Sequence, residues 1–280
     1  MLSLLPTPIG NLRDITLRTL DTLASCDTLL CEDVRVTKRL FFLLSQGGIL
    51  KMPSKPLHSL HSHNQEGFLA QVGHGFFTNQ HVGYLSDAGM PCVSDPGARL
   101  VRFAQEHGID YEVLPGASAC VSAYSASGFD IKAFHFVGFL PPKSADRRAK
   151  IAKLIASVAA LQTEIACVIY ESPKRLLDTL GDLALMVPDD LIFAIKEMTK
   201  LHEQHHCGKI LEVYEKFKAL PPTVLRGEWV LVCALRPRSQ SVLSYQEIAD
   251  MDLPPKIKAK LLAKLKGVSS KLLYASGMRA

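Results

Sequence analysis

The segment YLSDAGMPCVSDPGARL, residues 84–100, contains residue types well suited to holding a ligand. It repeats a short phrase, Ser86-Asp87-Ala88-Gly89 and then Ser94-Asp95-Pro96-Gly97, directly after an apolar run. Small residues let the backbone approach a ligand closely, carboxylates give polar groups fixed partners, and prolines stiffen the loop. The segment therefore predicts a binding loop.

Three further loops of the same character follow predicted strands: TPIGNL at 7–12, PGASAC at 115–120 and YESP at 170–173. In open α/β sheets, ligands bind outside the carboxyl ends of the strands. Any one of these loops is also explained as an ordinary turn, because Gly, Pro, Ser and Asp dominate turns. Four such loops together favour one shared site.

Short apolar runs alternate with longer helical patterns along most of the chain, which predicts α/β architecture with mostly parallel strands. Strands are expected at 2–6, 28–33, 81–87, 111–115, 134–140, 165–170, 191–197 and 228–235. Helices are expected after Asp14 and near Ile210, from Ser144, and at 98–107, 117–126 and 172–186.

The rhythm of these elements restarts after Gly128. We therefore expect two open α/β domains, residues 1–128 and 129–236, with a cofactor cleft between them at a hinge near residues 128–133. A linker from Arg236 to Leu243 leads to a small C-terminal helical segment, the basic tail of residues 244–280, in which two short helices are expected.

The composition limits which classes of protein this chain can belong to. With 48% hydrophobic and 21% charged residues, the chain has enough apolar material for substantial cores. Its seven cysteines are odd in number and form no Cys-x-x-Cys pair, which indicates reduced thiols and a cytoplasmic protein. The first residues lack a basic signal-peptide region, and no apolar run approaches the ~20 residues of a membrane span.

The net charge of +5 is unevenly distributed. Residues 253–280 contain seven Lys or Arg and no Asp or Glu, so the first 252 residues have a net charge of −2. A strongly cationic segment of this kind usually meets phosphates or an acidic surface. A small capping helix pair and a membrane-surface amphipath are the alternatives for the tail.

Several motifs together resemble the ribosomal RNA small subunit methyltransferase I family, within the tetrapyrrole methylase superfamily. The resemblance runs in order from about Leu2 to Ala234 and rests on TPIGNLRDITLRTLDTL, CEDVRVTKRL, SDAGMPCVSDPGARLV, LPGASA, GFLPPKS, YESPKRLLDTL and KEMTKLHE. It implies S-adenosylmethionine (SAM) in the cleft between two α/β domains, a homodimer, and methyl transfer to the ribose 2′-oxygen of a cytidine in small-subunit (16S) ribosomal RNA, free or in the assembled subunit.

The same resemblance implies the cofactor-binding residues. They are Pro8, Ile9 and Gly10 in the first loop, Asp87, Ala88, Gly89, Met90, Pro91, Val93 and Ser94 in the second, Gly116, Ala117 and Ser118 in the third, and Tyr170 from the second domain. The first loop has one glycine, Gly10, where the wider superfamily has several.

A ribose hydroxyl is a poor nucleophile while it is protonated, so a base or a nearby cation should assist the transfer. The catalytic candidates are Lys143, Glu171 and Arg35, with Glu32 and Asp33 beside Arg35. Lys143 opens a cationic run with Arg147, Arg148 and Lys150. It is suited to hold an RNA phosphate or to polarise the hydroxyl, or it begins an ordinary solvated helix. Arg35 either positions substrate or forms an internal ion pair with an acidic neighbour.

Two histidine-rich stretches have spacings that zinc sites use: His58, His61 and His63, and then His202, His205, His206 and Cys207. Methyl transfer from a sulfonium needs no Lewis acid, so no metal is expected. Three rival functions remain open: methylation of a small tetrapyrrole, magnesium-dependent phosphate hydrolysis through Asp33, Asp87 and Asp95, and RNA binding without catalysis.

Overall fold

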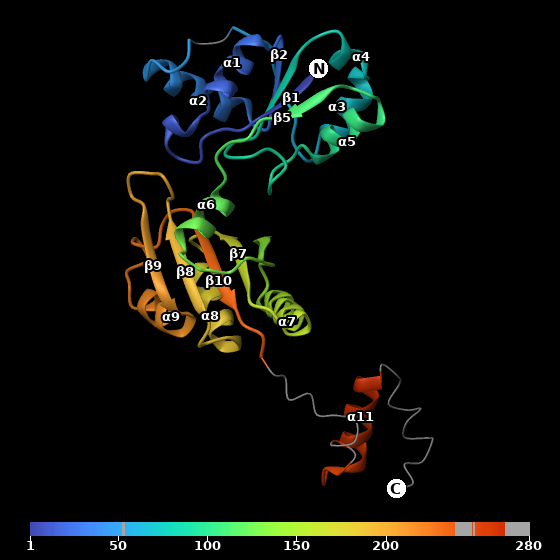
Figure 1. Cartoon of the computed structure of the whole chain (residues 1–280), viewed down its shortest axis with the longest axis vertical. Helices are drawn as coiled ribbons and strands as arrows, with labels where there is room; N and C mark the ends of the chain where they lie inside the picture. Colours follow the sequence, from blue (N-terminus) through green and yellow to red (C-terminus); the bar gives the residue numbers. More distant parts are fainter. Residues whose placement is uncertain (52–53, 239–247, 249, 267–280) are drawn as a thin grey trace.

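The computed structural model describes residues 1–51, 54–238, 248 and 250–266. Two five-stranded sheets lie one above the other along the long axis, and α11 (Pro255–Lys266) lies apart from both (Figure 1). The predicted α/β class is confirmed. Part of the predicted tail, residues 244–247, 249 and 267–280, lies outside the described residues, including the second of its two expected helices.

The first sheet has the order β3-β2-β4-β1-β5, and all of its neighbouring strands are parallel. Its strands are β1 (Leu2–Leu5), β2 (Thr28–Cys31), β3 (Leu57–Ser59), β4 (Val82–Leu85) and β5 (Tyr111–Val113). The three central strands are buried along their whole length, as parallel strands covered on both faces must be.

Helices cover both faces of this sheet. They are η1 (Leu12–Asp14), α1 (Leu17–Ser25), α2 (Val34–Gln46), α3 (Gln65–Val72), α4 (Gly75–Thr78) and α5 (Ala98–Glu106). Leu23 and Phe41 pack against Leu5, Leu29 and Leu85 on one face. Side chains of α3, α4 and α5 pack against β1 and β4 on the other face. The result is a three-layer sandwich whose strand ends are free to carry loops.

The second sheet has the order β6-β7-β10-β8-β9 and is mixed. Only β6 and β7 pair in parallel, whereas β10 runs antiparallel to both β7 and β8. Its strands are β6 (Phe134–Phe139), β7 (Ile165–Glu171), β8 (Leu191–Lys196), β9 (Gln204–Lys209) and β10 (Trp229–Leu235). The expectation of mostly parallel strands therefore holds for the first sheet but not for the second.

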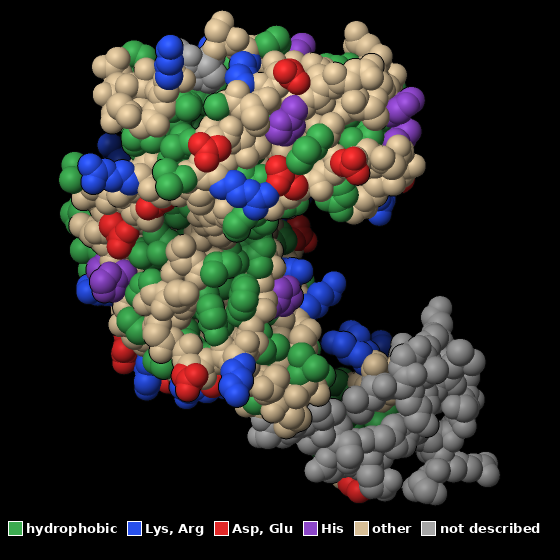
Figure 2. Space-filling model, turned by 45° about the horizontal axis from the view of Figure 1, so that its top comes forward, with side chains coloured by type: hydrophobic (Ala, Val, Ile, Leu, Met, Phe, Trp, Pro, Cys, Tyr) green, Lys and Arg blue, Asp and Glu red, His purple; other side chains and the backbone are tan. Residues whose placement is uncertain are grey.

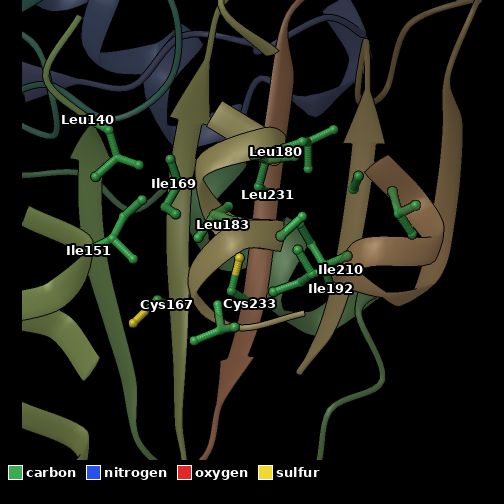
Figure 3. Close-up of a cluster of buried hydrophobic side chains, with 14 of the residues drawn as sticks. Leu140, Ile151, Cys167, Ile169, Leu180, Leu183, Ile192, Ile210, Leu231 and Cys233 are labelled. Carbon is green, nitrogen blue, oxygen red and sulfur yellow. The ribbon is translucent and has the colours of Figure 1, made fainter. Parts of the chain in front are cut away.

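Three helices cover one face of the second sheet: α7 (Ser144–Leu161), α8 (Leu176–Met186) and α9 (Ile210–Lys218). Leu and Ile side chains of these helices, such as Ile151 and Leu183, interdigitate with Ile169 and Leu231 of the sheet (Figure 3). The other face is covered by α6 (Ala119–Ala126), whose Cys120 and Ala123 pack on β7 and β10. This helix precedes residue 128, where we expect the first domain to end, yet it packs on the second sheet.

Candidate active site between the two domains

The first three predicted loops meet at the carboxyl ends of β1 and β4. Thr7 and Gly89 exchange two backbone hydrogen bonds of 2.9 and 3.1 Å and so join the first and second loops. A side-chain carbon on Gly89 would lie 3.2 Å from Cγ2 of Ile9 and 3.5 Å from the carbonyl oxygen of Ala117. The parallel register of β1 and β4 brings these loops together, since their strands end side by side.

The second loop has an unusual backbone. Cys92 and Ser94 have positive φ angles of 70° and 65°, which cost energy for residues with a Cβ atom. The Tyr84 hydroxyl donates a hydrogen bond of 3.0 Å to the carbonyl oxygen of Pro96, and this contact anchors the far end of the loop. Strain of this kind persists only where the surrounding structure enforces it.

A loop of the second domain, residues 197–200, closes over the first loop. The backbone N–H of Asn11 donates a 3.0 Å hydrogen bond to Oγ1 of Thr199. A Cβ atom on Gly10 would lie only 2.6 Å from both Oγ1 of Thr199 and Cγ of Lys200. Gly10 therefore permits contact between the domains, which is a different use from the cofactor contact predicted for it.

A cavity of about 370 Å³ lies where these loops face the second sheet. The first domain and the start of α6 supply Ile9, Ala88, Gly89, Met90, Val93, Ser94, Asp95, Ser118 and Ala119. The second domain supplies Phe139, Tyr170, Glu171, Ser172, Pro173, Met198, Lys200, Glu228, Trp229 and Val230. Its size and mainly apolar walls with a few polar groups are typical of small-molecule sites.

A second, more open cavity of about 790 Å³ adjoins the first and shares Ile9, Met90, Val93 and Ser118 with it. The predicted residues Gly116 and Ala117 line this second cavity. A Cβ atom on Gly116 would lie 2.3 Å from Cγ of Pro6, so the turn can run this close to the first loop only with glycine. The two cavities together form one interdomain cleft.

Most of the predicted cofactor residues line this cleft: Ile9, Ala88, Gly89, Met90, Val93, Ser94, Gly116, Ala117, Ser118 and Tyr170. The lining does not include Pro8, Gly10, Asp87 or Pro91. The Asp87 carboxylate instead accepts a 3.2 Å hydrogen bond from the backbone N–H of Asp33. Burial, more than any neighbouring charge, raises the pKa of Asp87.

Of the three catalytic candidates, Arg35 and Lys143 lie outside the cavity walls. The guanidinium of Arg35 binds the Asp33 carboxylate at 2.6 Å, and these hydrogen bonds lower the pKa of Asp33 to about 2. Asp33 also caps the start of α2. Arg35 thus forms the internal ion pair that was one of its two expected roles. Lys143 is the exposed N-cap residue of α7.

The third candidate, Glu171, lies in the cavity wall, but its carboxylate is occupied. It accepts hydrogen bonds from the backbone N–H of Ser172 at 2.8 Å, from Nε of Arg175 at 2.8 Å and from the Thr179 hydroxyl at 2.6 Å. The residue is only 2% exposed. These contacts hold the end of β7 against the start of α8.

Several cavity residues were not predicted from the sequence as part of this site, among them Met198, Lys200, Trp229 and Asp95. Asp95 repeats the Ser-Asp phrase that singled out Asp87, so the sequence did contain a signal for it. Nothing in the sequence pattern marks Trp229, which lies at the start of an ordinary buried strand.

The histidines lie away from the cavity walls. Two of them lie in β9: His205 stacks on Phe193, and His206 packs edge-on against Phe217. Among the described residues, no group of three or more His, Cys, Asp or Glu side chains is arranged to hold a metal ion. In the same part of the chain, no helix is both long enough and apolar enough to cross a membrane.

Comparison with known proteins agrees with this geometry. Residues 1–213 match the family model of the tetrapyrrole (corrin/porphyrin) methylases, so the fold is that of this class of methyltransferase. Among curated proteins, a ribosomal RNA small subunit methyltransferase I of Helicobacter pylori is 44% identical to this chain. The alignment covers 98% of this chain and 96% of the relative. Proteins of the same name from Campylobacter fetus and Haemophilus influenzae are 40% and 36% identical, with at least 96% of each chain covered.

The chain therefore belongs to the ribosomal RNA small subunit methyltransferase I family. It is a methyltransferase, and its methyl donor is SAM. The cleft suits this cofactor, because Gly89 and Gly116 let the three loops pack closely together beside it and the apolar walls can surround a nucleoside and a thioether side chain.

Proposed function

We propose that this protein transfers the methyl group of SAM to the ribose 2′-oxygen of a cytidine in small-subunit ribosomal RNA. The observation that supports this most directly is the cleft between the domains, whose walls come from four strand-end loops. The curated relatives of the chain are named for methylation of small-subunit ribosomal RNA. The proposed cofactor contacts are Ile9, Ala88, Gly89, Val93, Ser118 and Tyr170. SAM supplies an electrophilic methyl group on a sulfonium, and the charge on sulfur is lost as the methyl group leaves.

The residues of the cleft suit that reaction. Tyr170 packs edge-on against Phe136 and Phe139, with ring centroids 4.9 and 5.8 Å apart, and forms an apolar wall. Such a wall excludes water and favours a transition state in which charge disappears. The strained, anchored second loop fixes the opposite wall, so the reacting groups need little reorganisation.

Two surfaces are proposed to hold the RNA in the cytosol. Lys143, Arg148 and Lys150 are exposed at the start of α7. In the tail, α11 exposes Lys256, Lys260 and Lys264. Mapping of 2′-O-methylation in 16S ribosomal RNA from cells with and without this protein tests the activity. An unchanged methylation map would contradict it.

Removal of residues 244–280 is expected to weaken binding to small ribosomal subunits and to flatten the salt dependence of that binding. The removed segment includes seven cations, and each phosphate contact contributes about 0.7–0.9 to the slope of log K against log salt. SAM affinity should not change, because every cleft residue precedes residue 231. Equal slopes for folded full-length and truncated protein would assign the RNA to the α7 surface alone.

We also propose a homodimer that covers the free edge of the second sheet. The edge strand β6 exposes Phe134 by 43% and Phe139 by 57%, and the adjacent α6 exposes Val121 by 51%. Hydrophobic side chains gather on the face of the second domain seen in Figure 2. Exposed apolar side chains gathered on one face are typical of protein interfaces. Light scattering should give the mass of a dimer for the wild type and of a monomer for Val121→Asp.

A further inference from the structure

Asp95 is one of three carboxylates that line the cavity, beside Glu171 and Glu228. The Glu171 carboxylate is saturated by its three donors. The Glu228 carboxylate binds Nζ of Lys200 at 2.7 Å, and its side chain is 83% exposed. Asp95 differs from both, since no Lys or Arg of the described chain forms an ion pair with it. Its carboxylate is therefore available to a bound molecule.

The titratable groups around Asp95 come from both domains. Glu32 follows β2, Tyr84 lies in β4 and Asp87 follows it, Cys92 precedes Asp95 in the second loop, and the Tyr170 ring comes from β7 of the second domain. The Ser86 hydroxyl lies within hydrogen-bonding reach of the Asp95 carboxylate and favours its ionised form. Burial first, and then repulsion from Glu32 and Asp87, outweigh this contact and raise the pKa of Asp95 to about 7.

The backbone fixes Asp95 in the cavity wall. The preceding Ser94 has a positive φ angle of 65°, and its Oγ lies 3.6 Å from the place where a Cβ atom on Gly138 would be. The following Pro96 is anchored through its carbonyl oxygen to the Tyr84 hydroxyl. A Cβ atom on Gly97, at φ 123°, would lie 2.7 Å from the Tyr84 ring. Asp95 is thus held from both sides, as a group that acts on a bound substrate needs to be.

We propose that Asp95 accepts the proton of the RNA hydroxyl during methyl transfer. In this step a lone pair of the hydroxyl oxygen forms the new bond to the methyl carbon. The carbon–sulfur bond breaks with its electron pair remaining on sulfur, and the hydroxyl proton passes to the ionised Asp95 carboxylate. The carboxylate returns the proton to solvent after the product leaves. This inference rests on the proposed function.

The test compares Asp95→Asn, Asp95→Glu and the wild type in single-turnover methylation of small ribosomal subunits from cells that lack this protein. Asp95→Asn keeps the size of the side chain but cannot accept the proton. Its rate is expected to fall by about 100- to 10,000-fold, the usual contribution of a general base. Asp21→Asn, an exposed acid on α1, is the matched control and should react like the wild type.

Two further readouts separate this role from others. The wild-type rate should rise with pH up to about 7 and then level off, because only ionised Asp95 accepts the proton. Asp95→Glu should keep a pH-dependent rate, whereas Asp95→Asn should lose that dependence. SAM affinity, measured by calorimetry, should be the same for Asp95→Asn and the wild type.

Each contrary result has a distinct meaning. A folded Asp95→Asn variant that methylates at the wild-type rate overturns the proton-acceptor role and leaves the proposed function intact. A loss of SAM affinity that accounts for the whole loss of rate also overturns that role, because Asp95 would then hold the cofactor. A wild-type protein that leaves the ribosomal subunits unmethylated overturns both the proposed function and this inference.

Discussion

Ser118→Leu is expected to weaken SAM binding by one to two orders of magnitude while the protein stays folded. Ser118 lines both cavities of the cleft, at the N-cap of α6, where the third loop of the first domain passes to a helix on the second sheet. A leucine there would extend into space that the ligand needs. Overpacking costs about 1–3 kcal/mol, which weakens binding by about 5- to 150-fold.

Calorimetric titration with SAM measures this effect, and Ser157→Leu is its control. Ser157 is exposed on α7, on the far side of the second sheet from α6, and its substitution should leave affinity unchanged. Trp229 is the only tryptophan of the chain and lies in the cavity wall, so its fluorescence reports folding and binding together. Wild-type affinity in folded Ser118→Leu would place the cofactor away from the start of α6.

The elements that the sequence predicted well are those with buried faces. Strands β1, β2 and β4 consist of short apolar runs that are buried completely, and their order along the chain is enough to predict a parallel sheet. Strands β3 and β9 were not predicted. Both are edge strands, and neither is fully buried on any face, so no apolar alternation marks their sequences.

Within the candidate site, the loops were easier to predict than the individual side chains. Ser86-Asp87 and Ser94-Asp95 have the same chemistry in sequence, yet only Asp95 lines the cavity. The difference comes from backbone angles, since the positive φ angles at Cys92 and Ser94 redirect the chain before Asp95. Side-chain direction in an irregular loop has no period that a sequence pattern could display.

The contribution of β10 to the cavity wall depends on sheet topology. Because β10 runs antiparallel to its neighbours, its first residue lies beside the last residues of β7 and β8: Trp229 pairs with Glu171 and with Lys196. The start of this strand therefore reaches the same edge as the carboxyl ends of the others. A search for strand-end loops alone misses it, because that rule assumes parallel strands.

The largest effect on stability is expected for Asp182→Asn. Arg147 lies in the cationic run expected to contact RNA, but its side chain is only 3% exposed and donates from Nε to Asp182 at 2.7 Å. Asp182 also accepts a 3.0 Å hydrogen bond from the Ser144 hydroxyl, which fixes the start of α7 on α8. Removing the carboxylate leaves a buried guanidinium without its counter-charge, which costs about 3–5 kcal/mol.

Urea unfolding followed by Trp229 fluorescence measures this loss, because the tryptophan is buried in the second domain. Asp178→Asn changes an exposed acid on the same helix and should shift the free energy of unfolding by about 0.5 kcal/mol or less. The double variant Arg147→Met with Asp182→Leu should recover most of the stability, since apolar residues can replace a buried ion pair. If Asp182→Asn instead has the same urea midpoint as Asp178→Asn, the ion pair between Arg147 and Asp182 contributes nothing to the stability of the fold.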